Sequence, residues 1–167
     1  MKRLIILGSG GYGRTVADIA TQLGYEIIFL DDSIPDHLLS SYMDYIGKEG
    51  VEFIPAFGNN VFRLEWINKL QNHGAKIATL IHPTSYISPT ASVAEGCVIL
   101  PHAIINTDTT IEKGCIINLG AIVDHGCVLE EGCHICLGAI VKGENRVERL
   151  TKIEAGEVIE ARRWPTK

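Results

Sequence analysis

The most regular feature of the chain is an aliphatic side chain at every sixth position of its second half. From Ile81 to Ile159, each sixth residue is Ile, Val or Leu without exception. The set comprises Ile81, Ile87, Val93, Ile99, Ile105, Ile111, Ile117, Val123, Leu129, Ile135, Val141, Val147, Ile153 and Ile159. Self-similarity at a fixed period is typical of a solenoid, and a six-residue period indicates a parallel β-helix. The residue four places after each aliphatic is usually small, which suits a narrow prism interior.

Outward-pointing side chains can be sorted by face, because three six-residue units per coil bring positions eighteen apart together. One predicted face carries aliphatic residues alone, namely Ile104, Ile122, Ile140 and Val158. An exposed stripe of large apolar side chains rarely faces water in a monomer. Contact with the same prism in other subunits would cover this stripe and close into a ring, so we expect a homotrimer. Burial beneath the N-terminal region is the alternative explanation.

The first 80 residues follow a different pattern, in which short apolar runs alternate with helical periodicity. Strands are predicted over 3–7, 26–30, 53–57 and 77–80, and helices over 15–23 and 61–72. Pro55 favours an edge position or a strand end for the third strand. The alternation indicates a small parallel α/β sheet of Rossmann-like type. We therefore expect a Rossmann-like domain over 1–80, a β-helix over 81–160 and a C-terminal tail over 161–167.

A glycine-rich loop follows the first predicted strand. Gly8, Gly10 and Gly13 fit the pattern G-x-G-x-x-G, whose backbone N–H groups can hold a phosphate at a helix N-terminus. Asp31 and Asp32 end the second strand, where an acid can reach a ribose hydroxyl. A region of only 80 residues is half of a full dinucleotide fold, which favours a one-base nucleotide such as a nucleotide-sugar over NAD. A tight strand-to-helix turn without any ligand is the alternative.

Composition and charge narrow the function further. The net charge of −5 and the pI near 5.6 argue against a nucleic-acid surface. No apolar run approaches the roughly 20 residues that cross a membrane. The first apolar run ends at Gly8, too soon for a signal peptide, so we expect a cytoplasmic protein. Four of the cysteines occupy the small inward phase of the repeat, which predicts buried thiols and neither disulfides nor a metal site.

Two histidines lie where the repeat could bring them to a reaction centre. His125 follows Val123 by two residues, at a corner beside the aliphatic stripe, and His134 interrupts an otherwise aliphatic face. Gly143 lies eighteen residues after His125, so its N–H should stack one coil above the imidazole, about 5 Å away. A base paired with an available N–H suits acyl transfer, because one group deprotonates the nucleophile and the other receives the oxyanion. An ordinary polar surface role is the alternative for each histidine.

Several short motifs together resemble those of bacterial hexapeptide-repeat acetyltransferases of the sialic acid O-acetyltransferase and UDP-amino-sugar N-acetyltransferase type. They are Gly8–Arg14, Leu30–Asp32, Phe57–Asn60 with Arg63, Ile81–Pro83, Ile117–Asn118, Val123–His125, Gly132–Ile135 and Leu137–Ala139. The resemblance covers nearly the whole chain. It implies a left-handed parallel β-helix trimer with active sites between subunits, acetyl-CoA as donor, and a UDP-linked amino sugar held partly by the N-terminal domain.

The resemblance also implies a role for individual residues. His125 matches the general base, and Gly143 matches the glycine whose N–H faces the thioester carbonyl. His134 matches a histidine near the acetyl group or the bound sugar. The expected substrate contacts are Gly8, Gly10, Gly11, Asp31, Asp32, Asn118 and His134, and the expected acetyl-CoA contacts are His134 and Gly143.

Two departures from the family pattern concern the base and the C-terminus. Relatives commonly carry Asp or Glu directly after the base, where this chain has Gly126. Asp124 precedes the base and could replace that acid, although neighbours in an extended segment tend to face opposite ways. The repeat is also shorter, because Glu157 occupies an inward phase near the end.

The function predicted from the sequence is acetyl transfer from acetyl-CoA to the amino group of a UDP-linked amino sugar in bacterial glycan biosynthesis, without a metal. Sugar O-acetylation is the nearest alternative, and nucleotide-sugar binding without turnover is another. A zinc hydratase would need three converging histidines, and His102 lies at a different phase of the repeat from His125 and His134.

Overall fold

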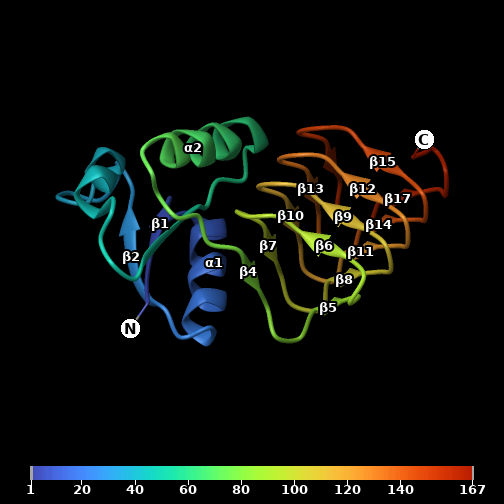
Figure 1. Cartoon of the computed structure of the whole chain (residues 1–167), viewed down its shortest axis with the longest axis horizontal. Helices are drawn as coiled ribbons and strands as arrows, with labels where there is room; N and C mark the ends of the chain where they lie inside the picture. The colour runs from blue at the N-terminus through green and yellow to red at the C-terminus, as the bar shows by residue number, and fades with distance from the viewer. Residues whose placement is uncertain (1, 167) are drawn as a thin grey trace. The chain divides into compact units, whose positions relative to one another are not determined.

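The computed structural model describes residues 2–166, and the chain divides after Leu80 into two compact units. The first unit contains three parallel strands in the order β2-β1-β3, namely β1 (Arg3–Leu7), β2 (Glu26–Leu30) and β3 (Val51–Pro55). Helix α1 (Gly11–Gln22) joins β1 to β2, and helix α2 (Asn60–Asn72) follows β3. A 3₁₀ helix, η1 (Leu39–Tyr45), precedes β3. Figure 1 shows α1 and α2 on opposite sides of the sheet, which confirms the Rossmann-like prediction.

Alternate residues of the strands supply the core of this unit. Ile5 and Phe53 pack with Tyr42 of η1 and Trp66 of α2 in one buried cluster. Because side chains alternate across a strand, Leu4 and Ile54 face the other side, where they are also buried. A sheet covered on both faces explains why its strands are continuous apolar runs in the sequence.

The predicted elements differ from the structure at three places. Helix α1 begins at Gly11 and not at residue 15, because the glycine loop itself enters the helix. Strand β3 begins at Val51 and ends at Pro55, on an edge of the sheet, as the proline indicated. The predicted fourth strand is wrong: Ile77 forms only an isolated bridge to Phe53, and the chain then leaves the sheet.

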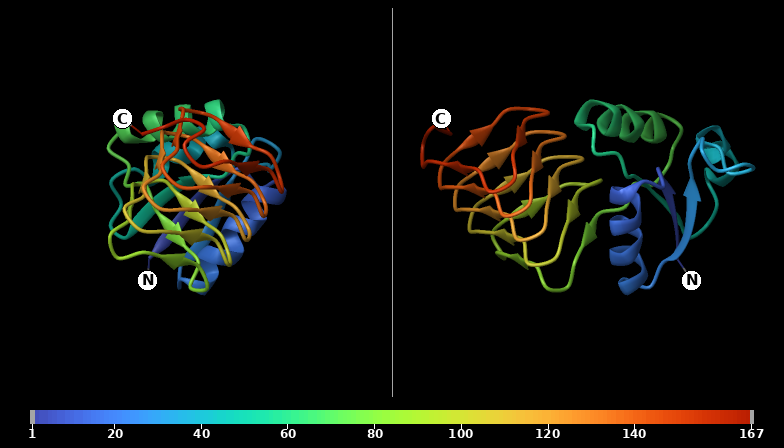
Figure 2. Two further views of the ribbon diagram at one scale, coloured as in Figure 1. Left: turned by 90° about the vertical axis from the view of Figure 1, so that its right-hand side faces the viewer. Right: turned by 180° about the vertical axis from the view of Figure 1, so that it is seen from behind.

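The second unit is a left-handed parallel β-helix of two-residue strands, seen from three directions in Figures 1 and 2. One face contains β4 (Leu80–Ile81), β7 (Val98–Ile99), β10 (Ile116–Ile117), β13 (His134–Ile135) and β16 (Lys152–Ile153). The second contains β5 (Tyr86–Ile87), β8 (Ile104–Ile105), β11 (Ile122–Val123), β14 (Ile140–Val141) and β17 (Val158–Ile159). The third contains β6 (Ser92–Val93), β9 (Thr110–Ile111), β12 (Val128–Leu129) and β15 (Arg146–Val147). The parallel pairings between these strands join residues eighteen apart, as the repeat predicted.

The inward aliphatics form the core of the prism. From Ile99 to Val147 each of them is at most 1% exposed. Burying one such side chain contributes about 1.5–3 kcal/mol, so the stacked set is the main source of stability. Cys97, Cys115 and Cys133 lie among them as free thiols, each donating to a backbone carbonyl of the adjoining turn.

Residues 161–166 fold back over the last coil. The carbonyl of Trp164 accepts a hydrogen bond from the Arg146 N–H, and its ring packs against the buried core of the prism. Asn145, which is fully buried, accepts from the Trp164 N–H and donates to the carbonyls of Lys142 and Glu160. The segment predicted as a tail is therefore an ordered cap on the β-helix. Among residues 2–166, no helix has the length and apolar character needed to cross a membrane.

Candidate active site

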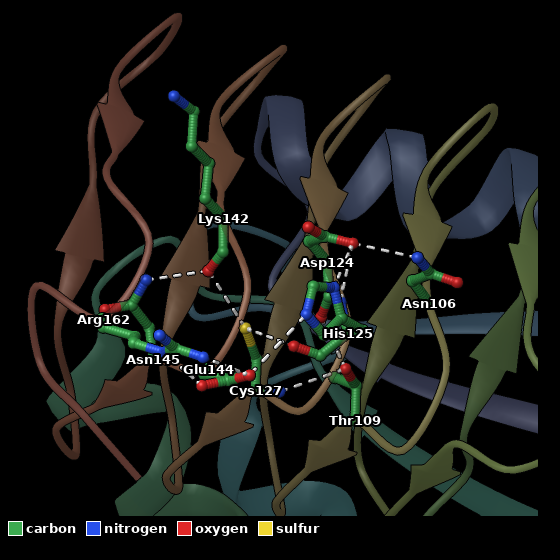
Figure 3. A network of polar contacts seen from close by, with 9 residues as sticks. All are labelled: Asn106, Thr109, Asp124, His125, Cys127, Lys142, Glu144, Asn145 and Arg162. Carbon is green, nitrogen blue, oxygen red and sulfur yellow. Dashed lines mark hydrogen bonds and ion pairs between the residues drawn. The ribbon is translucent and has the colours of Figure 1, made fainter.

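His125 lies at the corner that follows strand β11 (Figure 3). Its Nδ1 atom is 3.1 Å from Oδ1 of Asp124. In an extended strand these two neighbouring side chains would point to opposite sides. Strand β11, however, ends at Val123, and the chain turns at Gly126, which has φ 63°. Thr109, inside the prism, donates to the Asp124 carbonyl at 2.7 Å and holds the corner. The two side chains meet because both belong to a turn.

Asp124 is itself anchored by the coil beneath it. Its Oδ1 atom accepts from Nδ2 of Asn106 at 2.9 Å and from the His125 N–H at 2.8 Å. Partial burial alone would raise the pKa of Asp124, but these hydrogen bonds outweigh it and hold the pKa below its usual value. The carboxylate therefore stays ionised and keeps the proton of the neutral imidazole on Nδ1. Nε2 is left as the basic atom.

Gly143 lies directly against the imidazole. A Cβ atom at this position would be 2.5 Å from Cε1 of His125 and 2.8 Å from Nε2, closer than side chains approach. Any side chain at position 143 would therefore have to displace the imidazole ring from its observed position. The Gly143 N–H has no hydrogen-bond acceptor among residues 2–166, so it is available to a ligand in the groove that Gly143 lines.

These groups line an open groove of about 460 Å³. Its walls are Asp124, His125, Lys142, Gly143, Glu144, Ala161 and Arg162. The aliphatic stripe lies on the same face: Ile104 and Val158 are exposed, and Ile122 and Ile140 are half-buried. The site therefore adjoins an apolar surface that the described chain leaves uncovered.

Asn118 and His134 form a second pair on another face. Nδ2 of Asn118 lies 3.0 Å from Nε2 of His134, and Oδ1 of Asn118 accepts from the Leu119 N–H at 2.8 Å. The amide is therefore oriented to donate to the histidine, whose proton is then on Nδ1. His134 is only 9% exposed and does not line the groove of His125. The structure brings the two predicted substrate residues together, but apart from the predicted base.

The glycines of the first unit have different roles. Gly8 has φ 102°, and a Cβ atom there would meet Phe57 and the Ala56 carbonyl at about 3 Å. A Cβ atom at Gly13 would be 2.1 Å from the Gly8 carbonyl oxygen, so both glycines are required by the strand-to-helix turn. Nothing lies within 4 Å of a Cβ atom at Gly10 or Gly11. The fold does not require these two glycines, and both face a groove of about 440 Å³.

The two aspartates after β2 also differ. Oδ2 of Asp31 accepts from the backbone and hydroxyl of Ser9, and Oδ1 accepts from the backbone and hydroxyl of Ser33. These bonds, those from Ser33 first, hold the pKa of Asp31 far below its usual value. Asp31 therefore ties the glycine loop to the strand end through both of its oxygens, and it also lines the glycine groove. Within residues 2–166, Asp32 accepts only from the Leu39 N–H, and it is exposed, so it retains acceptor capacity.

The comparisons with known proteins concern the family and the fold. The family model of the PglD N-terminal domain matches residues 3–70. The acetyltransferase domain of PglB from Neisseria gonorrhoeae FA1090 is 30% identical, with a TM-score of 0.89 over 96% of this chain and 83% of that one. The chain belongs to the hexapeptide-repeat sugar N-acetyltransferase family. Another structure of the PglB domain, in complex with acetyl coenzyme A, is 31% identical, with a TM-score of 0.88 over 96% and 82%.

A more distant structure shares the fold of this sugar N-acetyltransferase. PerB from Caulobacter crescentus, solved with CoA and GDP-perosamine, is 23% identical, with a TM-score of 0.82 over 96% of this chain and 90% of that one. The predictions of the family, the fold and an acetyltransferase that uses acetyl-CoA are confirmed at the level of the family. The residue assignments stay predictions.

Sequence reasoning missed two residues near the groove of His125, and it named Arg63 only as part of a motif. Asn106 lies eighteen residues before Asp124, and Glu144 lies eighteen residues after Gly126. The coil repeat could therefore have identified both. Arg63 is buried in α2 and donates to the Phe57 carbonyl at 3.0 Å, which shapes the loop lining the glycine groove. Within residues 2–166, no group of three or more His, Cys, Asp or Glu side chains is placed to hold a metal. His102 lies at a separate turn and belongs neither to the pair of Asp124 with His125 nor to the pair of Asn118 with His134.

Proposed function

We propose that this protein transfers the acetyl group of acetyl-CoA to the amino group of a UDP-linked amino sugar in bacterial glycan biosynthesis. The observation that carries the proposal is the arrangement around His125. Asp124 holds Nδ1, and the ring lies on Gly143, whose N–H is free to bind an oxyanion. A base and an oxyanion donor side by side are the two groups that aminolysis of a thioester requires.

In this proposal the neutral sugar amine attacks the thioester carbonyl while Nε2 of His125 accepts one of its protons. The Gly143 N–H stabilises the negative charge on the carbonyl oxygen of the tetrahedral intermediate. Collapse of the intermediate breaks the C–S bond, and the imidazolium returns the proton to the departing thiolate. Asp124 acts as a positioning residue, because it stabilises the imidazolium without accepting its proton.

No covalent enzyme intermediate is needed for this direct transfer. The thiol of Cys127 lies closest to the corner, and burial raises its pKa above the usual value. A buried, protonated thiol is a poor nucleophile. Catalysis by His125 through attack of the amine is the simpler mechanism.

The first unit is the proposed nucleotide-sugar domain. The loop at Gly10 and Gly11 leaves room for a diphosphate to approach backbone N–H groups at the N-terminus of α1. Asp32 supplies the free carboxylate for a ribose hydroxyl, and Asp31 keeps the loop in place. The family relation of the PglB acetyltransferase domain, and PerB with its GDP-linked sugar, support a nucleotide-linked acceptor. We further propose that the nucleotide of the acceptor is UDP rather than GDP.

The homotrimer is proposed on the exposed stripe. Tyr86, Ile104 and Val158 are 54%, 38% and 41% exposed, in one column beside His125. A heterologous contact at this column would bury it and bring a second subunit to the groove. We propose that Asn118 and His134 contact a substrate held between subunits. The cytoplasmic location stays a prediction.

The test of the function is a thiol-release assay with acetyl-CoA. The acceptors are UDP-glucosamine, UDP-3-amino-3-deoxyglucose, UDP-4-amino-4-deoxyglucose and GDP-perosamine, with the matching hydroxyl sugars beside them. We expect turnover of a UDP-linked amine, and a kcat lowered about 10²- to 10⁴-fold by His125→Ala. His102→Ala, at a turn elsewhere, should leave kcat unchanged. Turnover of a hydroxyl sugar would make this an O-acetyltransferase, and binding without turnover would make it a binding protein.

A further inference from the structure

Glu144 lies where the acid missing at position 126 would otherwise be. It follows Gly143 in the turn one coil above the base, with φ 58°. A Cβ atom on Gly126 would be in ordinary contact with Cγ of Glu144, 3.5 Å away. The Glu144 side chain therefore covers Gly126, the position at which the acetyltransferases that this sequence resembles carry an acid. The chain brings a carboxylate to the base from the next coil instead of from the next residue.

The carboxylate of Glu144 lies on the side of the imidazole opposite Asp124. Its Oε1 atom is 4.0 Å from Nε2 of His125, the atom that would accept the proton (Figure 3). Nε and Nη2 of Arg162 donate to its two oxygens, and the Arg162 N–H donates to the Gly143 carbonyl. The C-terminal cap thus fixes the direction of the carboxylate. The hydrogen bonds from Arg162 keep the pKa of Glu144 below its usual value, so it stays ionised.

We propose that Glu144 is the residue that recognises the ammonium group of the amino sugar and delivers its nitrogen to His125. The proposal rests on the proposed function and names the charge state in which that acceptor binds. Oε1 and Nε2 would subtend an angle of roughly 90° at a nitrogen about 2.8 Å from each, which is within about 20° of the tetrahedral angle between two N–H bonds. One amine can therefore donate to both atoms at once.

Glu144 and His125 have different roles in the movement of protons. The bound ammonium donates one proton to Glu144 as a hydrogen bond and transfers another to Nε2, which releases it to solvent. The neutral amine then attacks, Nε2 takes the second proton, and the leaving sulfur receives it. The sum is R–NH₃⁺ plus acetyl-CoA giving the amide, CoA thiol and one free proton. Glu144 remains a carboxylate throughout and never accepts the proton.

The ion pair with Arg162 is by itself no reason to assign Glu144 to the substrate. A comparable pair, Lys142 with Glu160 at 2.7 Å, lies across the same two coils. What distinguishes Glu144 is the contact with Nε2 and the groove that both residues line. Glu160→Gln is therefore a matched control, since it removes an equivalent charge and ion pair without facing the base.

The experiment compares Glu144→Gln with the wild type, using whichever of the four amino sugars above turns over fastest. Calorimetry without acetyl-CoA measures binding of three forms: the amine, its N-acetylated product and the sugar with a hydroxyl in its place. We expect Glu144→Gln to weaken binding of the amine about tenfold and to raise its KM similarly, because one charged hydrogen bond is lost. Binding of the product and of the hydroxyl sugar should not change, nor should the KM for acetyl-CoA.

The outcomes separate the role of Glu144 from the proposed function. Equal weakening of all three sugars, or an unchanged KM for the amine, would overturn the role of Glu144 while leaving the proposed function intact. An equal effect of Glu160→Gln would overturn it too, by showing a general effect of surface charge. Glu144→Asp, which keeps the charge on a shorter side chain, should recover part of the lost affinity. If the wild type acetylates none of the four sugars, the proposed function fails and this inference fails with it.

Discussion

Gly143→Ala is the substitution that most directly tests the geometry of the base. The added Cβ atom would be 2.5 Å from Cε1 of His125, whereas carbon atoms in contact lie about 3.5–4.0 Å apart. The ring must therefore move by about 1 Å or more. Its Nδ1 atom is only 3.1 Å from Asp124, so such a movement takes the pair beyond hydrogen-bonding distance.

The expected result is a loss of activity without a loss of the fold. A displacement of about 1 Å at a reacting group costs on the order of 10²-fold in rate, and we expect kcat to fall by about that factor. The His125 side chain is 56% exposed and can turn toward solvent, and the Gly143 backbone lies outside the left-handed region. The alanine therefore strains neither core nor backbone, and Tm should stay within about 2 °C of the wild type.

Gly138→Ala is the matched control, for which we expect a lower Tm and an unchanged kcat. Gly138 has φ 62°, and nothing lies within 4 Å of a Cβ atom there. Alanine in this conformation costs about 1 kcal/mol, which should lower Tm by about 2–4 °C and leave kcat unchanged. Thiol release at saturating substrates and a thermal melt measure both quantities for each variant.

The combination with His125→Ala refines the test. If Gly143→Ala acts by displacing the base, it should have almost no further effect on kcat once the imidazole is gone. A Gly143→Ala enzyme with kcat close to the wild-type value would refute the assignment of His125, in its observed position, as the base. A full additional 10²-fold loss in the double variant would instead assign the effect to the oxyanion site.

Three further predictions concern other parts of the chain. Gly10→Val places a side chain in the glycine groove, so binding of the UDP-sugar should weaken about tenfold or more in calorimetry while binding of acetyl-CoA is retained; equal loss of both would show that the loop is only structural. Ile122→Glu puts a charge into the apolar stripe and should convert a trimer into monomers in light scattering, with loss of activity, whereas a monomeric wild type would contradict the proposed assembly. Burial, together with the hydrogen bond to Glu52, raises the pKa of Tyr25 from 10 to about 12. Because the pKa of Tyr25 is higher in the folded than in the unfolded state, protonated Tyr25 stabilises the folded state. This contribution to the free energy of unfolding is complete below about pH 10 and is lost as the pH rises through 12. Urea unfolding from pH 9 to 12 should show that loss in the wild type and a smaller one in Tyr25→Phe; equal slopes would contradict the hydrogen bond.

The resemblance to acetyltransferases succeeded for the family because it rested on many short motifs in one order. The individual roles that it implies stay predictions. Asp31 fits the position of a ribose-binding acid, yet Ser9 and Ser33 occupy both of its oxygens. His134 was expected near the acetyl group or the bound sugar, and the structure adds that it pairs with Asn118 on a different face from His125. A motif specifies residue types at a place in the fold, but not how their hydrogen bonds are used.

The sequence alone determined the architecture of this protein. The six-residue period dictates which side chains point inward, and the eighteen-residue coil dictates which residues stack, so Gly143 could be placed over His125 in advance. Both are properties of a regular strand, in which side-chain direction follows from position. The first sheet was predicted less accurately, because residues 77–80 suit a strand locally but leave the sheet after one bridge.

Only the tertiary structure decided how the site is assembled. Asp124 turns toward His125 because a corner, unlike a strand, does not alternate its side chains. Glu144 reaches Nε2 from the next coil, and the cap that carries Arg162 holds it there. Turn conformation and contacts between coils depend on residues far apart in the chain, whereas periodicity records only near neighbours. For that reason the sequence predicted His125, Gly143 and Asp124 as candidates, but neither the turn of Asp124 toward the imidazole nor the approach of Glu144 from the next coil.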